Sequence, residues 1–78
     1  MKEVVLYTRS ACSLCKTARA VILSLKREVE FVFREVDIDG DRELFEEHKH
    51  DIPVIEIDGK RAFKYRVDSD ALRRRLEA

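Results

Sequence analysis

A change of hydrophobic period around residue 12 constrains the fold of this chain most. Residues 4–7 (VVLY) form a short apolar run without a polar alternate, which is typical of a strand buried on both faces. After residue 12 the apolar residues recur at the spacing of one helix face: Leu14, Ala18, Val21, Ile22 and Leu25. The sequence therefore predicts a strand over residues 3–7 and a helix over residues 13–27.

The only two cysteines, Cys12 and Cys15, lie at this junction of strand and helix. Free backbone N–H groups and the positive end of the helix dipole stabilise an anion there, which favours the reactive thiolate form of Cys12. Cys15 lies one helical turn further along the same side, where it is more shielded from solvent and close enough to form a disulfide. This arrangement favours Cys12 as a nucleophile and Cys15 as a resolving cysteine.

A structural disulfide and a metal site are the alternatives to redox chemistry. A disulfide that closes so short a ring restricts the unfolded chain little, and it would stabilise the fold by only about 2 kcal/mol, against about 3 kcal/mol for a loop of ~15 residues. Stabilisation therefore explains the spacing poorly. A zinc site needs four ligands, and beyond the cysteine pair the chain offers only His48 and His50, far along the sequence. We therefore expect redox chemistry and no metal site, with both histidines at the surface or half-buried.

The charge balance and the N-terminus bear on partners and location. Sixteen basic and sixteen acidic residues cancel, so no net field would attract nucleic acid or an anionic membrane. No apolar segment approaches the length of a signal peptide or a membrane span. We expect a cytoplasmic protein, monomeric by default, in whose reducing compartment a close cysteine pair is more often catalytic than structural.

The rest of the chain alternates strand and helix signals. Asp58-Gly59 between two apolar runs predicts a two-residue hairpin turn. The alternating residues Asp37, Asp39 and Asp41 lack the glycine placement and distal Glu of a calcium loop, so they favour helix capping, and Ser10 is a candidate cap for the first helix. The remaining expected elements are strands at 31–38, 54–57 and 60–65, the first of them less buried, and helices at 41–48 and from Asp68.

This order gives one α/β domain over residues 1–78: a βαβ unit joined to a ββα unit, with a four-stranded mixed sheet and helices on both faces. The Cys12–Cys15 motif follows the first strand, and a proline opens the third strand. With these features the chain resembles the glutaredoxin-like family of the thioredoxin-fold superfamily, whose fold is βαβαββα. The resemblance covers nearly the whole chain, and the residues that carry it are Tyr7, Cys12, Cys15, Ile52-Pro53-Val54 and Asp58-Gly59.

The resemblance implies a thiol–disulfide oxidoreductase that acts on a disulfide-containing protein or a small thiol substrate. Pro53 would be cis and lie against the cysteine motif, and Ile52 would present its backbone to the substrate, a pairing that an extended peptide can make. Arg9 corresponds to a basic residue that holds a glutathione carboxylate, and Ser13 and Leu14 would contact the substrate. No cofactor would be tightly bound, and either glutathione or a reductase would supply electrons.

The chain also departs from the family. Ser13-Leu14 stands where glutaredoxins usually carry an aromatic residue, and residues 63–66 (FKYR) replace the Gly-Gly pair that lets glutathione approach the backbone. Bulky side chains there would obstruct glutathione. Two other functions on the same fold therefore stay open: a non-catalytic, redox-sensing module, and a dimer that binds an iron–sulfur cluster with thiols from outside the chain.

Overall fold

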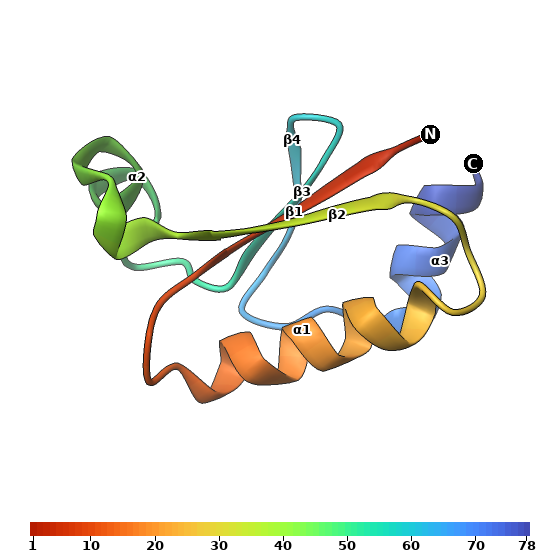
Figure 1. Cartoon of the computed structure of the whole chain (residues 1–78), viewed down its shortest axis with the longest axis horizontal. Coiled ribbons are helices and arrows are strands. Elements are labelled where there is room, and N and C mark those ends of the chain that lie inside the picture. Colours follow the sequence, from red (N-terminus) through yellow and green to blue (C-terminus); the bar gives the residue numbers. More distant parts are fainter.

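Four strands form one mixed sheet in this computed structural model, which describes residues 1–78 (Figure 1). They are β1 (Glu3–Thr8), β2 (Val32–Asp37), β3 (Val54–Ile57) and β4 (Lys60–Lys64), in the order β2-β1-β3-β4. β1 pairs parallel to β2 and antiparallel to β3, and β3 pairs antiparallel to β4. Asp58 and Gly59 both have positive φ, +50° and +83°, as the predicted tight hairpin requires.

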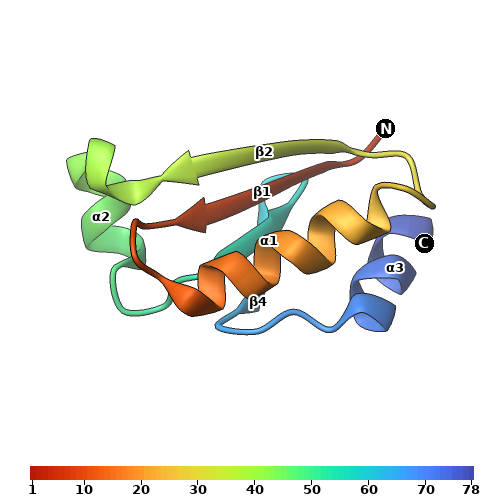
Figure 2. The ribbon, with the colours of Figure 1, turned by 60° about the horizontal axis from the view of Figure 1, so that its bottom comes forward.

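Three helices cover the sheet: α1 (Ser13–Leu25), α2 (Arg42–His48) and α3 (Ser69–Glu77). Figures 1 and 2 show α1 and α3 together on one face, while α2 lies at the end of the sheet where β1 and β2 finish. The ring of Tyr7 points to the opposite face from Leu6 and stacks on His48 of α2, with centroids 4.4 Å apart. The predicted α/β architecture with helices on both faces is therefore confirmed.

The main core lies between the sheet and the α1–α3 face. Its buried members come from all layers: Val4, Leu6, Ala18, Ile22, Leu25, Phe31, Ile55, Ile57, Leu72 and Leu76. Val5, on the opposite face of β1, is also buried, which confirms a first strand buried on both faces. β2 is an edge strand with mostly exposed side chains, as its mixture of charged and apolar residues predicts.

Aspartates begin the later helical elements. Asp41 Oδ1 accepts a hydrogen bond from the N–H of Leu44 at 3.1 Å, and Asp68 Oδ2 accepts one from Ala71 at 2.9 Å. Asp37 caps a short 3-10 helix, η1 (Ile38–Gly40), which the sequence did not predict. Asp37 and Asp41 therefore act as caps, as expected, whereas Asp39 lies within η1 and its side chain pairs with Arg9.

The end of α1 and the depth of His48 differ from the sequence predictions. The helix stops at Leu25, two residues early, because Arg27 and Glu28 donate to carbonyls three rather than four residues back. His48 is 1% exposed instead of half-buried, because it lies between the Tyr7 ring and the guanidinium of Arg61, whose Nη2 is 3.2 Å from Nδ1 of the histidine. His50 is exposed, as predicted.

Neighbouring positions on α1 provide a test of the core. Ile22 is fully buried and Leu23 is 46% exposed. We expect Ile22→Ala to lower the free energy of unfolding by about 2–5 kcal/mol, because it leaves a cavity between helix and sheet. Leu23→Ala should change it by less than about 0.5 kcal/mol. Urea denaturation with the disulfide intact measures both, and equal losses would contradict this packing.

Tyr7 gives a pH-dependent test of the packing against α2. Burial raises the pKa of its hydroxyl above the usual 10.0, and the charge of Glu56, to which it donates a hydrogen bond at 3.2 Å, raises the pKa further. The neutral hydroxyl is thus favoured in the folded protein. Its contribution to stability is present below pH 10.0 and is lost as the pH rises through the folded pKa.

The ultraviolet absorbance difference between wild type and Tyr7→Phe isolates this titration. We expect a midpoint above 10.0 in the folded protein and a return to about 10 in urea. In Glu56→Gln the folded midpoint should move down, because the variant removes the charge that disfavours ionisation. A titration midpoint that changes neither in urea nor in Glu56→Gln would show that Tyr7 does not have this environment.

Candidate active site

A disulfide joins Cys12 and Cys15 at the start of α1, with Cα atoms 5.2 Å apart. Cys12 is the N-cap residue, and its Sγ accepts a hydrogen bond from the N–H of Cys15 at 3.2 Å. Ser10, the predicted cap, is displaced from that role because the chain turns at Ala11 (φ +56°) and brings the cysteine to the helix end. A backbone N–H of the first helical turn, which has no carbonyl partner within the helix, thus donates to the sulfur of Cys12 at the positive end of the helix dipole.

The two sulfurs differ in exposure. Cys15 is 1% exposed and packs on the buried side of α1, whereas Cys12 is half-buried and lines an open hollow of about 350 Å³. The other residues of this hollow are Arg9, Ser10, Ala11, Ser13, Leu14 and Ile52. Four predicted substrate-contacting residues, from two distant segments, therefore meet around the outer cysteine.

Pro53, the fifth predicted residue, is buried and does not line the hollow, and the Ile52–Pro53 bond is cis, as the resemblance implied. No hydrogen bond within the chain engages the N–H or C=O of Ile52. The carbonyl of Pro53, by contrast, accepts a hydrogen bond from the N–H of Tyr65 at 2.8 Å. The backbone of Ile52, which has no hydrogen bond within the chain, therefore borders the hollow that contains Cys12.

Arg9 lines the hollow, but its guanidinium is already engaged. Its Nε lies 3.1 Å from Oδ1 of Asp39, and the guanidinium carbon is 5.1 Å from the centroid of the Phe45 ring. The side chain is 40% exposed, so the pair is accessible to solvent and screened by salt. A bound carboxylate would have to compete with Asp39 for this cation.

Contacts that the sequence did not predict hold the segment before Pro53. The hydroxyl of Tyr65 donates to the carbonyl of His50 at 3.0 Å, and Arg61 pairs with Asp51 at 3.2 Å. Tyr65 itself has φ +67°, a left-handed conformation that is rare for a residue with a large side chain. No local signal reveals this role of Tyr65, because its partners belong to a different segment.

The chain brings together no group of three or more His, Cys, Asp or Glu side chains that could hold a metal ion. Separately, none of its helices combines the length and apolar character needed to span a bilayer.

Comparison with known proteins adds family evidence to this geometry. The family model described as glutaredoxin-like domain (DUF836) matches residues 3–77. The glutaredoxin-like protein YDR286C homolog of Dictyostelium discoideum is 39% identical over 77 residues, covering 91% of this chain and 71% of its own.

Solved structures agree with the fold. Protein Ne2328 from Nitrosomonas europaea has a TM-score of 0.82 and 27% identity, covering 96% of this chain and 91% of its own. Target protein XcR50 from X. campestris has a TM-score of 0.76 and 30% identity, with 95% of each chain covered. A thioredoxin mutant from Halobacterium salinarum, at 18% identity and a TM-score of 0.75, covers 97% of this chain and 72% of its own and shares the fold. From the family model and the Dictyostelium relative together, this chain belongs to the glutaredoxin-like domain family.

Proposed function

We propose that this protein is a thiol–disulfide oxidoreductase with Cys12 as nucleophile and Cys15 as resolving cysteine. The observation that carries the proposal is the asymmetric Cys12–Cys15 pair at the start of α1. The outer sulfur lines an open hollow and receives a helix N–H, while the inner one is buried within disulfide distance. The glutaredoxin-like family supports the same chemistry.

The reaction begins with the dithiol form. The Cys12 thiolate attacks one sulfur of a substrate disulfide, a mixed disulfide forms, and the other substrate sulfur leaves as a thiolate that takes up a proton. Cys15 then loses its proton and attacks the sulfur of Cys12, which releases the second substrate thiol and closes the Cys12–Cys15 disulfide. Two electrons pass from the dithiol to the substrate, and an external thiol or reductase restores the dithiol.

The hollow around Cys12 supplies the substrate contacts. An extended segment of the substrate pairs with the free N–H and C=O of Ile52, which places its disulfide against Cys12. Ser13 and Leu14 also line the hollow, and the buried Pro53 fixes the chain next to Ile52. Main-chain pairing of this kind recognises the shape of an extended peptide, so selectivity among substrates must come from side chains nearby.

The proposal includes the setting of the reaction. The protein acts as a monomer in the cytoplasm, without a tightly bound cofactor and without nucleic-acid or membrane partners, on disulfides of proteins or small thiols. Glutathione or a flavoprotein reductase supplies the electrons, and the reduction of disulfides contributes to cell redox homeostasis. The cysteine usage favours this setting, because a reducing compartment returns the pair to the dithiol between turnovers.

Single cysteine variants test the two roles. We expect Cys12→Ser to reduce insulin disulfides at the background rate with dithiothreitol as donor, because it lacks the attacking thiolate. Cys15→Ser should accumulate a mixed disulfide at Cys12 that intact-mass spectrometry detects. Ser24→Ala, an exposed position near the far end of α1, serves as the matched control and should behave as wild type. Full activity of Cys12→Ser would refute the assignment.

The midpoint potential of the pair tests the electron donor. Equilibration in defined glutathione buffers, followed by thiol alkylation and mass analysis, should give a reversible couple between about −200 and −270 mV. A value near about −200 to −230 mV supports glutathione as donor, and about −270 mV or below supports a reductase. A pair that forms no disulfide at any potential would exclude dithiol chemistry. A reversible pair without turnover would instead indicate a redox sensor.

A further inference from the structure

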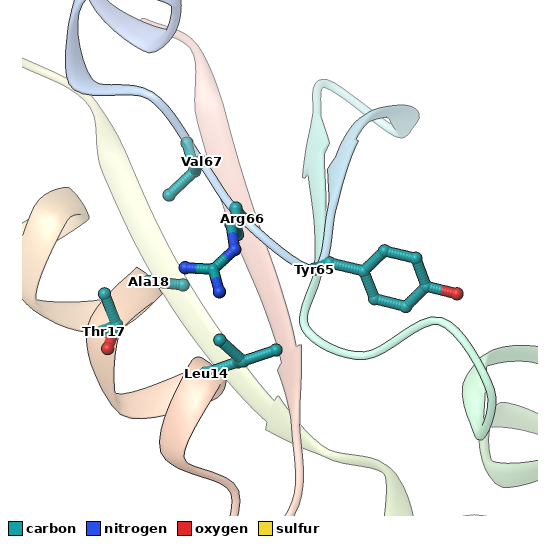
Figure 3. Close-up of a pocket in the computed structure, with 6 residues that line it drawn as sticks. All are labelled: Leu14, Thr17, Ala18, Tyr65, Arg66 and Val67. Carbon is teal, nitrogen blue, oxygen red and sulfur yellow. The ribbon is translucent and has the colours of Figure 1, made fainter.

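A second hollow lies beside the disulfide, between α1 and the turn that follows β4. Its volume is about 140 Å³, and Figure 3 shows the residues that line it: Leu14, Thr17, Ala18, Tyr65, Arg66 and Val67. Leu14 also lines the hollow that contains Cys12, so one side chain borders both spaces. A substrate segment bound at Cys12 therefore lies next to this pocket.

The lining is mainly apolar and includes one cation, Arg66. The hydroxyl of Thr17 already donates its proton to the carbonyl of Ser13 at 3.2 Å, so it does not donate to a ligand carboxylate. Figure 3 shows the guanidinium of Arg66 directed across the pocket towards α1. Arg66 takes part in none of the ion pairs of the chain, and no acidic residue lines the pocket. An unpaired guanidinium beside an apolar lining fits a carboxylate that neighbours an apolar group.

The turn that carries Tyr65 and Arg66 is held in a rare conformation. The N–H of Arg66 donates to the carbonyl of Lys64 at 2.7 Å, which closes a three-residue γ-turn around Tyr65. The bonds from Tyr65 to the carbonyls of Pro53 and His50 hold the turn in place. Left-handed backbone at a large residue persists only where its surroundings fix it, and such positions cluster at binding sites. The pocket is therefore formed before any substrate arrives.

We propose that this pocket is a specificity subsite, which binds an apolar side chain next to the disulfide cysteine of a peptide substrate while Arg66 binds an adjacent carboxylate. The inference rests on the proposed disulfide exchange at Cys12. A space of 140 Å³ holds about five waters at ~30 Å³ each, which is enough for one apolar side chain of the size of leucine. Glutathione has carboxylates but no such side chain. The preferred substrate is thus a protein segment with an apolar and an acidic residue beside its cysteine.

Competition for the trapped form of the protein tests this preference. Cys15→Ser is mixed with equal amounts of oxidised glutathione and of four peptide disulfides. Each peptide has one cysteine, followed by Leu or Ala and then by Glu or Lys. Intact mass identifies which partner is captured on Cys12. We expect the Leu-Glu peptide to exceed the Ala-Glu and Leu-Lys peptides by about tenfold each, because each of these lacks one of the two contacts.

Two variants in the Cys15→Ser background separate the contacts. Arg66→Ala should lose the preference for Glu over Lys and keep the preference for Leu over Ala. Thr17→Phe, at an exposed helix position, fills the pocket, so it should lose the preference for Leu over Ala and keep the preference for Glu over Lys. Arg74→Ala is the matched control, because this exposed arginine of α3 also lacks an ion pair but lies outside the pocket, and both preferences should stay.

The outcomes distinguish this inference from the proposed function. Equal capture of all four peptides, preferential capture of glutathione, or an unchanged charge preference in Arg66→Ala would overturn the subsite while leaving disulfide exchange intact. Capture of no partner at all, glutathione included, would overturn the exchange reaction itself and the subsite with it.

Discussion

The hydrogen bond from the N–H of Cys15 to the sulfur of Cys12 is the interaction on which the site depends. The other two α-helices begin with an aspartate, whose oxygen is a strong acceptor, whereas α1 begins with sulfur. The same atom thus completes the helix and carries the proposed chemistry. Because negative charge at a helix N-terminus is favourable, the thiolate state improves the cap while the helix improves the leaving group.

The start of α1 forms only one part of the hollow around Cys12. The segment before Pro53 supplies the other part, through Ile52. That segment has no regular secondary structure of its own. Its position is set from several sides: Arg61 of β4 pairs with Asp51, and Tyr65 binds the carbonyl of His50. The buried His48, stacked on Tyr7, fixes the point where the segment leaves α2. The backbone of Ile52 is therefore held in place although it has no hydrogen bond of its own.

The parts of this fold that rest on local rules could be predicted from the sequence. The period change at Cys12, the Asp58-Gly59 turn and the aspartate caps each lie within a few residues of what they determine. The stacking of His48 and the pocket beside Leu14 could not be predicted, because they depend on segments that meet only in the folded chain. Ser10 shows a further limit: it suits a cap chemically, but the turn at Ala11 decides which residue reaches the helix end.

The backbone conformation of Tyr65 has a consequence for how this turn can evolve. Its φ of +67° lies in the region that glycine occupies without steric penalty, so the main chain of this turn already has the shape that a glycine would adopt. Exchange between glycine and tyrosine at this point needs no rebuilding of the backbone. Figure 3 shows the Tyr65 ring directed away from the pocket, so such a substitution removes the hydrogen bond to the His50 carbonyl and leaves Leu14, Ala18 and Val67 in the lining. A lineage can therefore loosen or tighten the segment before Pro53 through residue 65 alone, while the dithiol stays unchanged.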